Sequence, residues 1–463
     1  MSRSPVIAIF DIGKTNKKLF LLDEQYRIVL EKSATIEETK DDDGDVCEDV
    51  EKLTNWVLQS TDAVLAMNDI DVKAINFSAY GASFVHLSNE GKPVAALYNY
   101  LKPFPAALQG KFYNQYGGEP AFSVNTASPV LGNLNSGLQL YYLKYKKPEL
   151  FNKIHCSLHL PQYMSYLITG KYYSDITSIG CHTALWNFPE SRYHDWVLIE
   201  NIMDKLAPVF PSNQLINGSR KDRLIQCGVG LHDSSAALIP YLSAFTEPFV
   251  LISTGTWCIS LNPFNQMKLT ATELQEDCLC YMEYRGKPVK AARLFSGNEH
   301  EEQVKKLAAH FNKAADYYKT IIFDIAIAGK LSQTNSSEKK DKAPDSMIKK
   351  SFFGKRDMSV YKDYNEAYHQ LMLDLVTQQV GSTNLVLNNC PVKRIFVDGG
   401  FGKNNVYMNL LAAAFPDIEV YASSVAQASA IGAALAVHTS WNNNASTINT
   451  IELTKYNSSL VID

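Results

Sequence analysis

Cysteine is scarce in this sequence, with 8 residues in 463 and no Cys-x-x-Cys pair. That density is too low for a disulfide-stapled fold, so we expect reduced and mostly buried thiols. Long apolar runs are also absent: no stretch of about 18 apolar residues occurs, which argues against a membrane span. The chain also has no large excess of charge of either sign. The 44 basic residues nearly balance the 48 acidic ones, so a broad nucleic-acid surface is not expected.

The beginning of the chain shows no secretory leader. Residues Met1–Phe10 hold one arginine and a short apolar run that stops at Asp11, and no cleavage pattern follows. We therefore expect a cytoplasmic protein. His155, Cys156 and His159 suggest a metal site by their spacing, but no second ligand pair lies nearby in the sequence, and ordinary structural side chains are the favoured interpretation.

What the sequence does contain is material for a large core. Hydrophobic residues make up 46% of the chain and aromatic residues 11%, a globular composition whose length predicts two or three domains. Two stretches, residues 6–22 and 249–261, share one pattern: an apolar strand, a short polar turn with glycine, and a second apolar strand. This repetition predicts two domains of related topology.

Other segments give weaker expectations of local structure. They are a solvated acidic loop at Asp41–Asp45, a helix with Leu53 and Val57 on its buried face, a hairpin over 84–93, a mobile polar insertion over 332–350, and a small-residue helix over 428–437. The polar cluster at 297–302 is interpreted as the capped, solvated start of a helix, with nucleotide or metal contact as the alternative.

The first polar turn, Asp11–Asn16, imitates the end of a P-loop. That pattern needs glycine where Ala8 stands and a helix after the lysine, whereas an apolar strand follows. A turn between strands still binds phosphate through backbone N–H groups when a glycine lets the ligand approach. The candidate phosphate ligands are Gly13, Lys14, Thr15, Asn16, Lys17 and Lys18. Asp11 is a candidate Mg²⁺ ligand, and an ordinary hairpin turn is the alternative.

Two further glycine motifs point to a nucleotide. The second polar turn sets two hydroxyls beside a glycine, and a pair of such turns could clamp one triphosphate. The third motif follows an apolar strand but departs from the dinucleotide pattern, because Asn405 stands in place of its last glycine. We interpret it as space for a base or ribose. The candidate nucleotide ligands of these motifs are Thr254, Gly255, Thr256, Gly399, Gly400 and Asn404.

A carboxylate follows a glycine-rich approach at Gly228–Asp233. Asp233 precedes a run of small residues and is suited to cap a helix there. The alternative is a general base at the junction of the two domains, directed toward a substrate hydroxyl.

These motifs, in this order and spacing, resemble the FGGY family of carbohydrate kinases over essentially the whole chain. The resemblance implies two RNase H-like α/β domains of the sugar kinase/Hsp70/actin type with a central cleft. It places a sugar-binding domain at 1–242 and a nucleotide-binding domain at 243–463. It also implies ATP and Mg²⁺ as cofactors, Asp233 as the catalytic base, and the rhamnulokinase and fuculokinase branch as the most similar part of the family.

The sequence departs from the family's usual residues in the part that is expected to bind the sugar. Tyr80–Ser83 replaces a Gly-Gln-x-His stretch common in xylulokinases, and Tyr100 stands where an aspartate is common. Lys14 and Gln427 depart from the family's usual residues as well. The candidate sugar contacts are Gly81, Ser83, Asn99, Tyr100, His182 and His232. For His182 a structural role is the favoured alternative.

The function implied is phosphorylation of a primary hydroxyl of a ketose. An apolar ring face at Tyr100 favours a deoxyketose such as L-rhamnulose or L-fuculose. The alternatives are a xylulose or ribulose kinase, a kinase of a polyol or related acceptor such as glycerol or gluconate, and a non-catalytic regulator on the same fold. We expect small-molecule partners and a possible homodimer, but no nucleic acid and no membrane.

Overall fold

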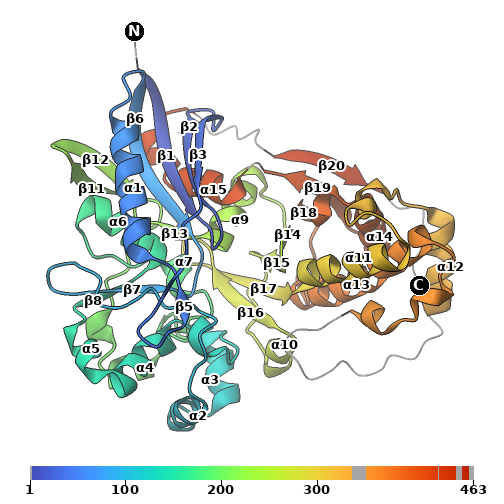
Figure 1. Cartoon of the computed structure of the whole chain (residues 1–463), viewed down its shortest axis with the longest axis horizontal. Coiled ribbons are helices and arrows are strands. Elements are labelled where there is room, and N and C mark those ends of the chain that lie inside the picture. Colours follow the sequence, from blue (N-terminus) through green and yellow to red (C-terminus); the bar gives the residue numbers. More distant parts are fainter. Residues whose placement is uncertain (1–2, 336–350, 426, 445–450, 458–463) are drawn as a thin grey trace.

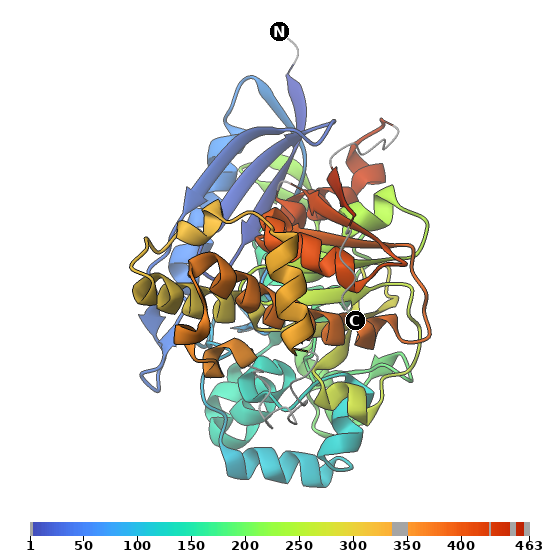
Figure 2. The same cartoon turned by 90° about the vertical axis from the view of Figure 1, so that its right-hand side faces the viewer.

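The computed structural model describes residues 3–335, 351–425, 427–444 and 451–457. The chain forms two halves side by side, each built around one large sheet (Figure 1). Residues coloured cyan to green form a mostly helical layer at the end of the molecule opposite the N terminus, as both ribbon views show (Figure 2).

The first sheet runs in the order β11-β12-β6-β1-β2-β3, and β13 also pairs with β6. Its strands are β1 (Ser4–Ile12), β2 (Lys17–Asp23), β3 (Ile28–Ala34), β6 (Ile70–Ala79), β11 (Leu215–Arg220), β12 (Arg223–Gly228) and β13 (Leu231–His232). The central strand β1 is antiparallel to β2 and parallel to β6. Because β1 is covered on both faces, residues 6–10 form a continuous buried run.

The second sheet runs in the order β16-β17-β15-β14-β18-β19-β20. Its strands are β14 (Phe249–Thr254), β15 (Cys258–Asn262), β16 (Cys278–Met282), β17 (Pro288–Leu294), β18 (Arg394–Gly399), β19 (Glu419–Ser424) and β20 (Glu452–Tyr456). Here β14 is antiparallel to β15 and parallel to β18. The first sheet's central arrangement thus recurs, which confirms the prediction of two related α/β domains.

Helices cover both sheets. In the first half they are α1 (Val50–Leu65), α2 (Ala106–Gln115), α3 (Glu119–Thr126), α4 (Gly137–Lys146), α5 (Pro148–Lys153), α6 (Leu160–Thr169), α7 (Ile176–Ile179), α8 (Asp195–Ile199) and α9 (Asp233–Ala244). In the second they are α10 (Ala271–Gln275), α11 (Ser296–His310), α12 (Ile325–Asn335), α13 (Tyr364–Leu387), α14 (Asn405–Ala414), α15 (Ala428–Ala436) and α16 (His438–Trp441). In the described part of the chain, no helix combines the length and apolarity that crossing a bilayer requires.

The expected helix of small residues is α15, and it joins the two halves. A Cβ at Gly432 would lie 1.8 Å from the Ala236 carbonyl oxygen on α9, so only glycine permits this contact. Asn76 of β6 donates a hydrogen bond of 2.8 Å to the Ala433 carbonyl. Although α15 lies late in the sequence, it therefore packs on the first sheet. The division at 242/243 stays a prediction.

One local expectation is confirmed and two need correction. The expected hairpin over 84–93 is present, with a Leu87–Pro93 bridge and hydrogen bonds from the Val94 N–H to the His86 carbonyl and from the Ser88 N–H to the Lys92 carbonyl, each 2.9 Å. The strand β7 (Phe84–Leu87) of this hairpin also pairs with β8 (Cys156–His159). The expected insertion at 332–350 begins inside α12, and residues 336–350 lie outside the described residues. The acidic loop is not simply solvated: it lies between β4 (Thr39–Lys40) and β5 (Val46–Cys47), and its Asp41 is buried in an ion-pair network.

Candidate active site between the two halves

The two predicted polar turns occupy equivalent places, each after the central strand of its sheet. In the first turn the Gly13 N–H bonds the Asn16 carbonyl at 3.0 Å; in the second the Gly255 N–H bonds the Trp257 carbonyl at 2.9 Å. Thr15 and Asn16 at the first tip are exposed, as are Gly255 and Thr256 at the second. Each turn therefore presents polar backbone to solvent, as an anion-binding turn requires.

The basic side chains of the first turn are already paired. Lys14 forms an ion pair with Glu38 at 3.0 Å, and Lys18 with Glu31 at the same distance. Lys17 is buried, contacts Glu48 at 2.5 Å and donates to the Lys14 carbonyl, so its expected role as a phosphate donor is wrong. The backbone of the turn is left as its main anion-binding feature.

Thr254 links the second turn to the third glycine motif. Its hydroxyl donates to the Asp398 carbonyl at 2.6 Å and accepts the Phe401 N–H at 3.0 Å. Gly399 has φ +92°, and a Cβ there would lie 1.9 Å from the Thr254 carbonyl oxygen. Gly400 faces open space instead. Thr254 and Gly399 thus hold the two loops together, and Gly255, Thr256 and Gly400 remain open to a ligand.

A pocket of about 450 Å³ adjoins the second turn. Its wall includes Gly255, Thr256, Gly297, Asn298, His300, Glu301, Lys305 and Tyr318. A Cβ at Gly297 would lie 1.8 Å from the Gly255 carbonyl oxygen, so the first turn of α11 packs directly on the second polar turn. The cluster at 297–302, interpreted from the sequence as a solvated helix start, thus contributes to a pocket wall. No spacing rule links residues 40 positions apart in this way.

His300 and Asn404 shape that region. The His300 ring packs against Tyr318 and Phe401, and its Nε2 lies 3.2 Å from the Tyr368 hydroxyl. Burial lowers the pKa of His300 to about 4, so the ring is neutral near pH 7. Asn404 accepts the Tyr407 N–H at the start of α14 and donates to Tyr368 at 2.7 Å. Its side chain has a structural role in addition to the predicted nucleotide contact.

Two carboxylates lie at the same end of the first sheet, since Asp11 of β1 and Leu231 of β13, two residues before Asp233, both pair with Ser78 of β6. Asp11, at the end of β1, is half-buried and accepts a 2.9 Å hydrogen bond from Ser429 of α15. Burial raises the pKa of Asp11 to about 6, and the nearby negative charge of Asp233 raises it as well. Asp233 is the first residue of α9, while His232 occupies the cap position. The helix-cap interpretation of Asp233 is therefore wrong.

Asp233 remains accessible. Its side chain is 37% exposed, and one carboxylate oxygen accepts the Ser234 N–H at 2.6 Å. The His232 Nε2 lies 3.5 Å from that same oxygen and 3.4 Å from the Cys181 sulfur. A Cβ at Gly81 would lie 2.8 Å from the His232 ring, so glycine is required for the close approach of that loop.

The other candidate sugar contacts differ in their burial and in their hydrogen bonds. Tyr100 is half-buried; burial raises its pKa, the charge of Lys14 lowers it and the charge of Asp233 raises it. Ser83 is buried. Asn99 uses its side-chain oxygen to accept the Leu101 N–H, so it shapes its own turn. His182 has φ +41°, and burial lowers its pKa to about 3.

One cluster of side chains beside these residues could not be predicted from the sequence. Arg293 of β17 is buried, pairs with Asp277 at 2.8 Å and lies over the Trp257 ring at 5.5 Å. Tyr281 of β16 lies 6.0 Å from His182 and 5.9 Å from His232, ring to ring. Strand pairing in the second sheet brings these residues to the cleft, and no motif marks them.

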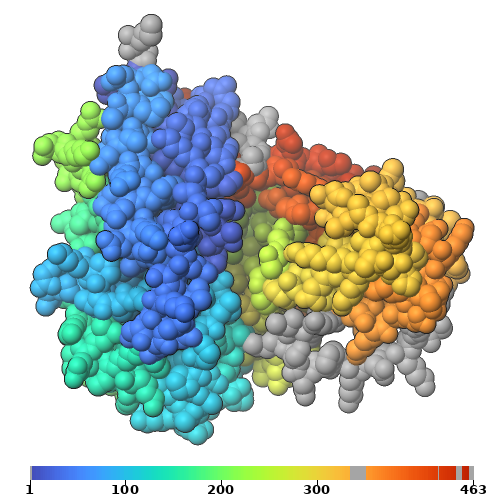
Figure 3. All heavy atoms as spheres, viewed as in Figure 1, coloured from blue at the N-terminus to red at the C-terminus, as the bar shows by residue number. Residues whose placement is uncertain are grey.

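The space-filling view shows a hollow between the blue and cyan first half and the yellow and orange second half (Figure 3). The carboxylates of Asp11 and Asp233, at the same end of the first sheet, are oxygen groups that could hold a divalent cation. Hard cations such as Mg²⁺ prefer this donor set.

Comparison with known sequences decides the family. A sequence model described as "FGGY family of carbohydrate kinases, N-terminal domain" matches residues 6–237, and one described as "Carbohydrate kinase FGGY, C-terminal domain" matches residues 246–445. The chain belongs to the FGGY family of carbohydrate kinases. This membership places it among phosphotransferases, and the resemblance inferred from the motifs is confirmed at the family level.

Individual relatives are distant. The chain is 22% identical over 223 residues to a rhamnulokinase of Oceanobacillus iheyensis, and that match spans only 46% of either sequence. A carbohydrate kinase from Novosphingobium aromaticivorans superposes with a TM-score of 0.79 at 22% identity, covering 100% of this chain and 95% of that one. A xylulose kinase from Lactobacillus acidophilus gives 0.76 at 15% identity, covering 98% and 94%. These structures confirm the two-domain fold.

Replacing Asp11 by asparagine should stabilise the free protein at neutral pH. The folded-state pKa of Asp11 lies above its ordinary value, so folding is penalised once pH exceeds that ordinary value. We expect Asp11→Asn to gain on the order of 2 kcal/mol at pH 8 and about half of that at pH 5. Urea unfolding at both values measures this. An unchanged or lower stability at pH 8 would contradict it.

Proposed function

We propose that this protein transfers the γ-phosphoryl group of ATP to a primary hydroxyl of a ketose. The observation that carries the proposal is that Asp11 and Asp233 lie at the same end of the first sheet, in a chain whose two glycine turns follow equivalent strands of the two sheets. Phosphoryl transfer depends mainly on positioning and on neutralising charge, and this arrangement supplies both.

The nucleotide would bind along the second half. Its base would enter the pocket formed by α11 and the second turn, and its phosphates would meet the backbone of Gly255 and Thr256. The first turn, at Gly13–Asn16, would approach the terminal phosphate from the opposite side. Backbone N–H groups suit this task because they bind phosphate oxygens without carrying a counter-charge of their own.

Asp11 would hold Mg²⁺, which neutralises charge on the phosphates when bound. Ser429 orients the Asp11 carboxylate by donating to one oxygen. The raised pKa of Asp11 fits such a site, since a buried carboxylate next to a second one is stabilised by a cation.

Asp233 would accept the proton of the attacking hydroxyl. One of its oxygens is held by the Ser234 N–H, and the side chain is exposed enough to reach a substrate. Such a general base contributes typically about 10²–10⁴-fold to the rate. Closure of the hollow between the halves would exclude water as a competing acceptor.

For the acceptor we propose a deoxyketose such as L-rhamnulose or L-fuculose. The support is the partial similarity to a rhamnulokinase and the half-buried ring of Tyr100 close to Asp233. The similarity to a xylulose kinase structure concerns the fold alone, and xylulose is the alternative that the acceptor test below addresses. We likewise propose that the protein requires ATP and Mg²⁺, uses the site residues named above and works in the cytoplasm.

Replacing the base should separate catalysis from nucleotide binding. Asp233→Asn should lower kcat by a factor on the order of 10² or more, because the attacking hydroxyl keeps its proton. ATP affinity by calorimetry should stay within about twofold. Asp195→Asn is a matched control: Asp195 also follows a histidine and begins a helix, α8, but it pairs with Arg192. Near-normal turnover of folded Asp233→Asn would remove Asp233 from this role, and no ADP release with any sugar would favour a non-catalytic regulator.

The proposed binding of phosphate by the second turn can be tested by adding a side chain at Gly255, which faces open space. A Cβ at Gly255 meets nothing closer than 3.9 Å, so Gly255→Val should fold while filling the space of a phosphate. We expect ATP affinity to fall about tenfold or more and sugar affinity to stay unchanged. Gly110→Val, in open space on α2, is the control. Calorimetry with each ligand separately decides, and unchanged ATP affinity counts against the clamp.

Acceptor choice can be tested at Tyr100. Tyr100→Asp exchanges a ring face for a carboxylate that accepts hydroxyl protons, so preference should move from L-rhamnulose and L-fuculose toward xylulose and ribulose by roughly tenfold. The measurement is kcat/KM for the four sugars. Leu101→Asp adds the same charge one residue away on an exposed side chain and is the control. A wild-type preference for xylulose, or an unaltered ranking, would refute Tyr100 as the selector.

A further inference from the structure

A buried chain of polar side chains lies beneath the first polar turn, and the proposed function leaves it without a role. Lys17, the first residue of β2, is 1% exposed, and lysine is rarely buried to this degree unless it is paired. Its ammonium group lies 2.5 Å from a carboxylate oxygen of Glu48 and donates a 3.0 Å hydrogen bond to the Lys14 carbonyl. Glu48 follows β5 directly and is buried as well. The pair therefore fastens the backbone of the turn from inside the protein.

The second oxygen of Glu48 holds the acceptor loop, residues 80–83. It accepts a hydrogen bond from the hydroxyl of Tyr80, which is buried. Burial and the charge of Glu48 raise the pKa of Tyr80 well above its ordinary value, so the hydroxyl keeps its proton and donates. The loop contains two of the candidate sugar contacts. The Tyr80 ring also lies edge-on to the ring of Tyr100, with the centroids 6.3 Å apart.

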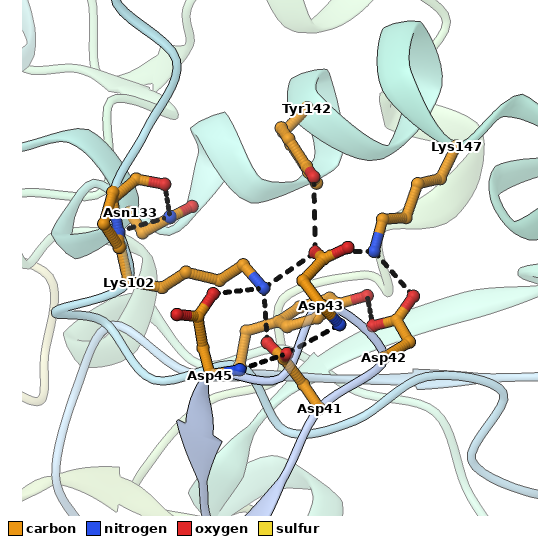
Figure 4. A network of polar contacts seen from close by, with 10 residues as sticks. Asp41, Asp42, Asp43, Asp45, Lys102, Asn133, Tyr142 and Lys147 are labelled. Atoms are coloured by element: carbon orange, nitrogen blue, oxygen red, sulfur yellow. Dashed lines mark hydrogen bonds and ion pairs between the residues drawn. The ribbon is translucent and has the colours of Figure 1, made fainter.

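The backbone of Glu48 is tied to the segment that carries Tyr100. It forms an antiparallel bridge with Leu97, at the start of that segment. The other end of the segment is held by Lys102, whose nearly buried ammonium group lies among carboxylates of the acidic loop (Figure 4). Residues 41–48 therefore fix both ends of the segment.

We propose that Glu48 is a positioning residue that couples nucleotide binding to acceptor binding. It fixes the first polar turn through Lys17 and the acceptor loop through Tyr80, so a shift on either side changes the geometry that the other side presents. A buried carboxylate suits this task because each oxygen is directed to one donor and bulk water does not compete for it. The inference rests on the proposed function, since it takes the first turn as a phosphate site and the acceptor loop as part of the sugar site.

A double variant removes the coupling without leaving a buried charge. In Lys17→Met/Glu48→Leu both charges are replaced together by apolar side chains, which avoids the strong destabilisation caused by one unpaired buried charge. Affinity for ATP and for the preferred sugar, each measured by calorimetry on the full chain, should fall at least about threefold, because both binding surfaces lose a fixed backbone. The preferred sugar is the one with the highest kcat/KM among the four of the acceptor test.

The buried pair of Lys290 and Glu273 is a matched control. Its contact is also 2.5 Å, both residues are buried, and the second Glu273 oxygen likewise accepts a hydrogen bond, from the Thr270 N–H. The pair joins β17 to α10, outside the residues assigned to either ligand. Lys290→Met/Glu273→Leu should therefore keep both affinities within about twofold of wild type. A similar loss of both affinities in this control would show a general loss of stability and overturn the proposal.

Tyr80→Phe removes only the contact toward the acceptor. KM for the preferred sugar should rise about threefold or more, while KM for ATP and kcat stay within about twofold, because Lys17 still pairs with Glu48. A merely structural effect of the lost hydroxyl would move kcat and both KM values together. An unchanged KM for the sugar, or an equal rise in KM for ATP, contradicts the proposal.

The outcomes separate this inference from the proposed function. If wild type binds ATP and sugar and the first double variant binds both equally well, the coupling is refuted and the proposed function stands. Loss of affinity for only one ligand also refutes it, because Glu48 then serves one side alone. If wild type phosphorylates none of the four sugars, the proposed function fails; unaltered ATP affinity in the double variant then overturns this inference separately.

Discussion

The packing of α15 directly on α9 joins the second half of the molecule to the end of the first sheet that carries Asp11 and Asp233. That contact requires Gly432, since any side chain there would occupy the space of the Ala236 carbonyl. From this position Ser429 reaches Asp11, and Asn76 of the first sheet reaches the backbone of α15. This helix pair therefore places the second half of the molecule beside the end of the first sheet that carries both carboxylates (Figure 1).

The nucleotide side of the site is built from backbone more than from charged side chains. Lys14, Lys17 and Lys18 of the first turn form ion pairs with Glu38, Glu48 and Glu31, respectively. The Thr254 hydroxyl forms hydrogen bonds with two backbone groups. Groups engaged in this way hold loops in fixed positions, and a fixed loop presents its N–H groups to a ligand without further ordering cost.

Buried ion pairs surround the acceptor side. Lys17 with Glu48 lies under the first turn, Arg293 with Asp277 lies behind Trp257, and Lys102 with Asp41 anchors the segment of Tyr100. Removing one member of such a pair typically costs about 3–5 kcal/mol, because a charge is left without compensation. Each ion pair fixes the backbone beside a candidate sugar contact. The shape of the proposed acceptor pocket therefore depends on charged residues that are not themselves proposed to contact the substrate.

The sequence by itself determined the repeated strand–turn–strand units, the glycine motifs and the helix of small residues, because each depends on neighbours within about ten residues. It also identified the family through those motifs. The sequence did not reveal that residues 297–302 line a pocket, that Arg293 and Tyr281 reach the cleft, or that Asp41–Asp45 enclose a lysine. Those facts depend on contacts between residues 16 to 61 positions apart, such as Asp277 with Arg293 and Asp41 with Lys102. Only packing of the two sheets and their helices brings such residues together, because no local pattern encodes which distant side chain fills a given space.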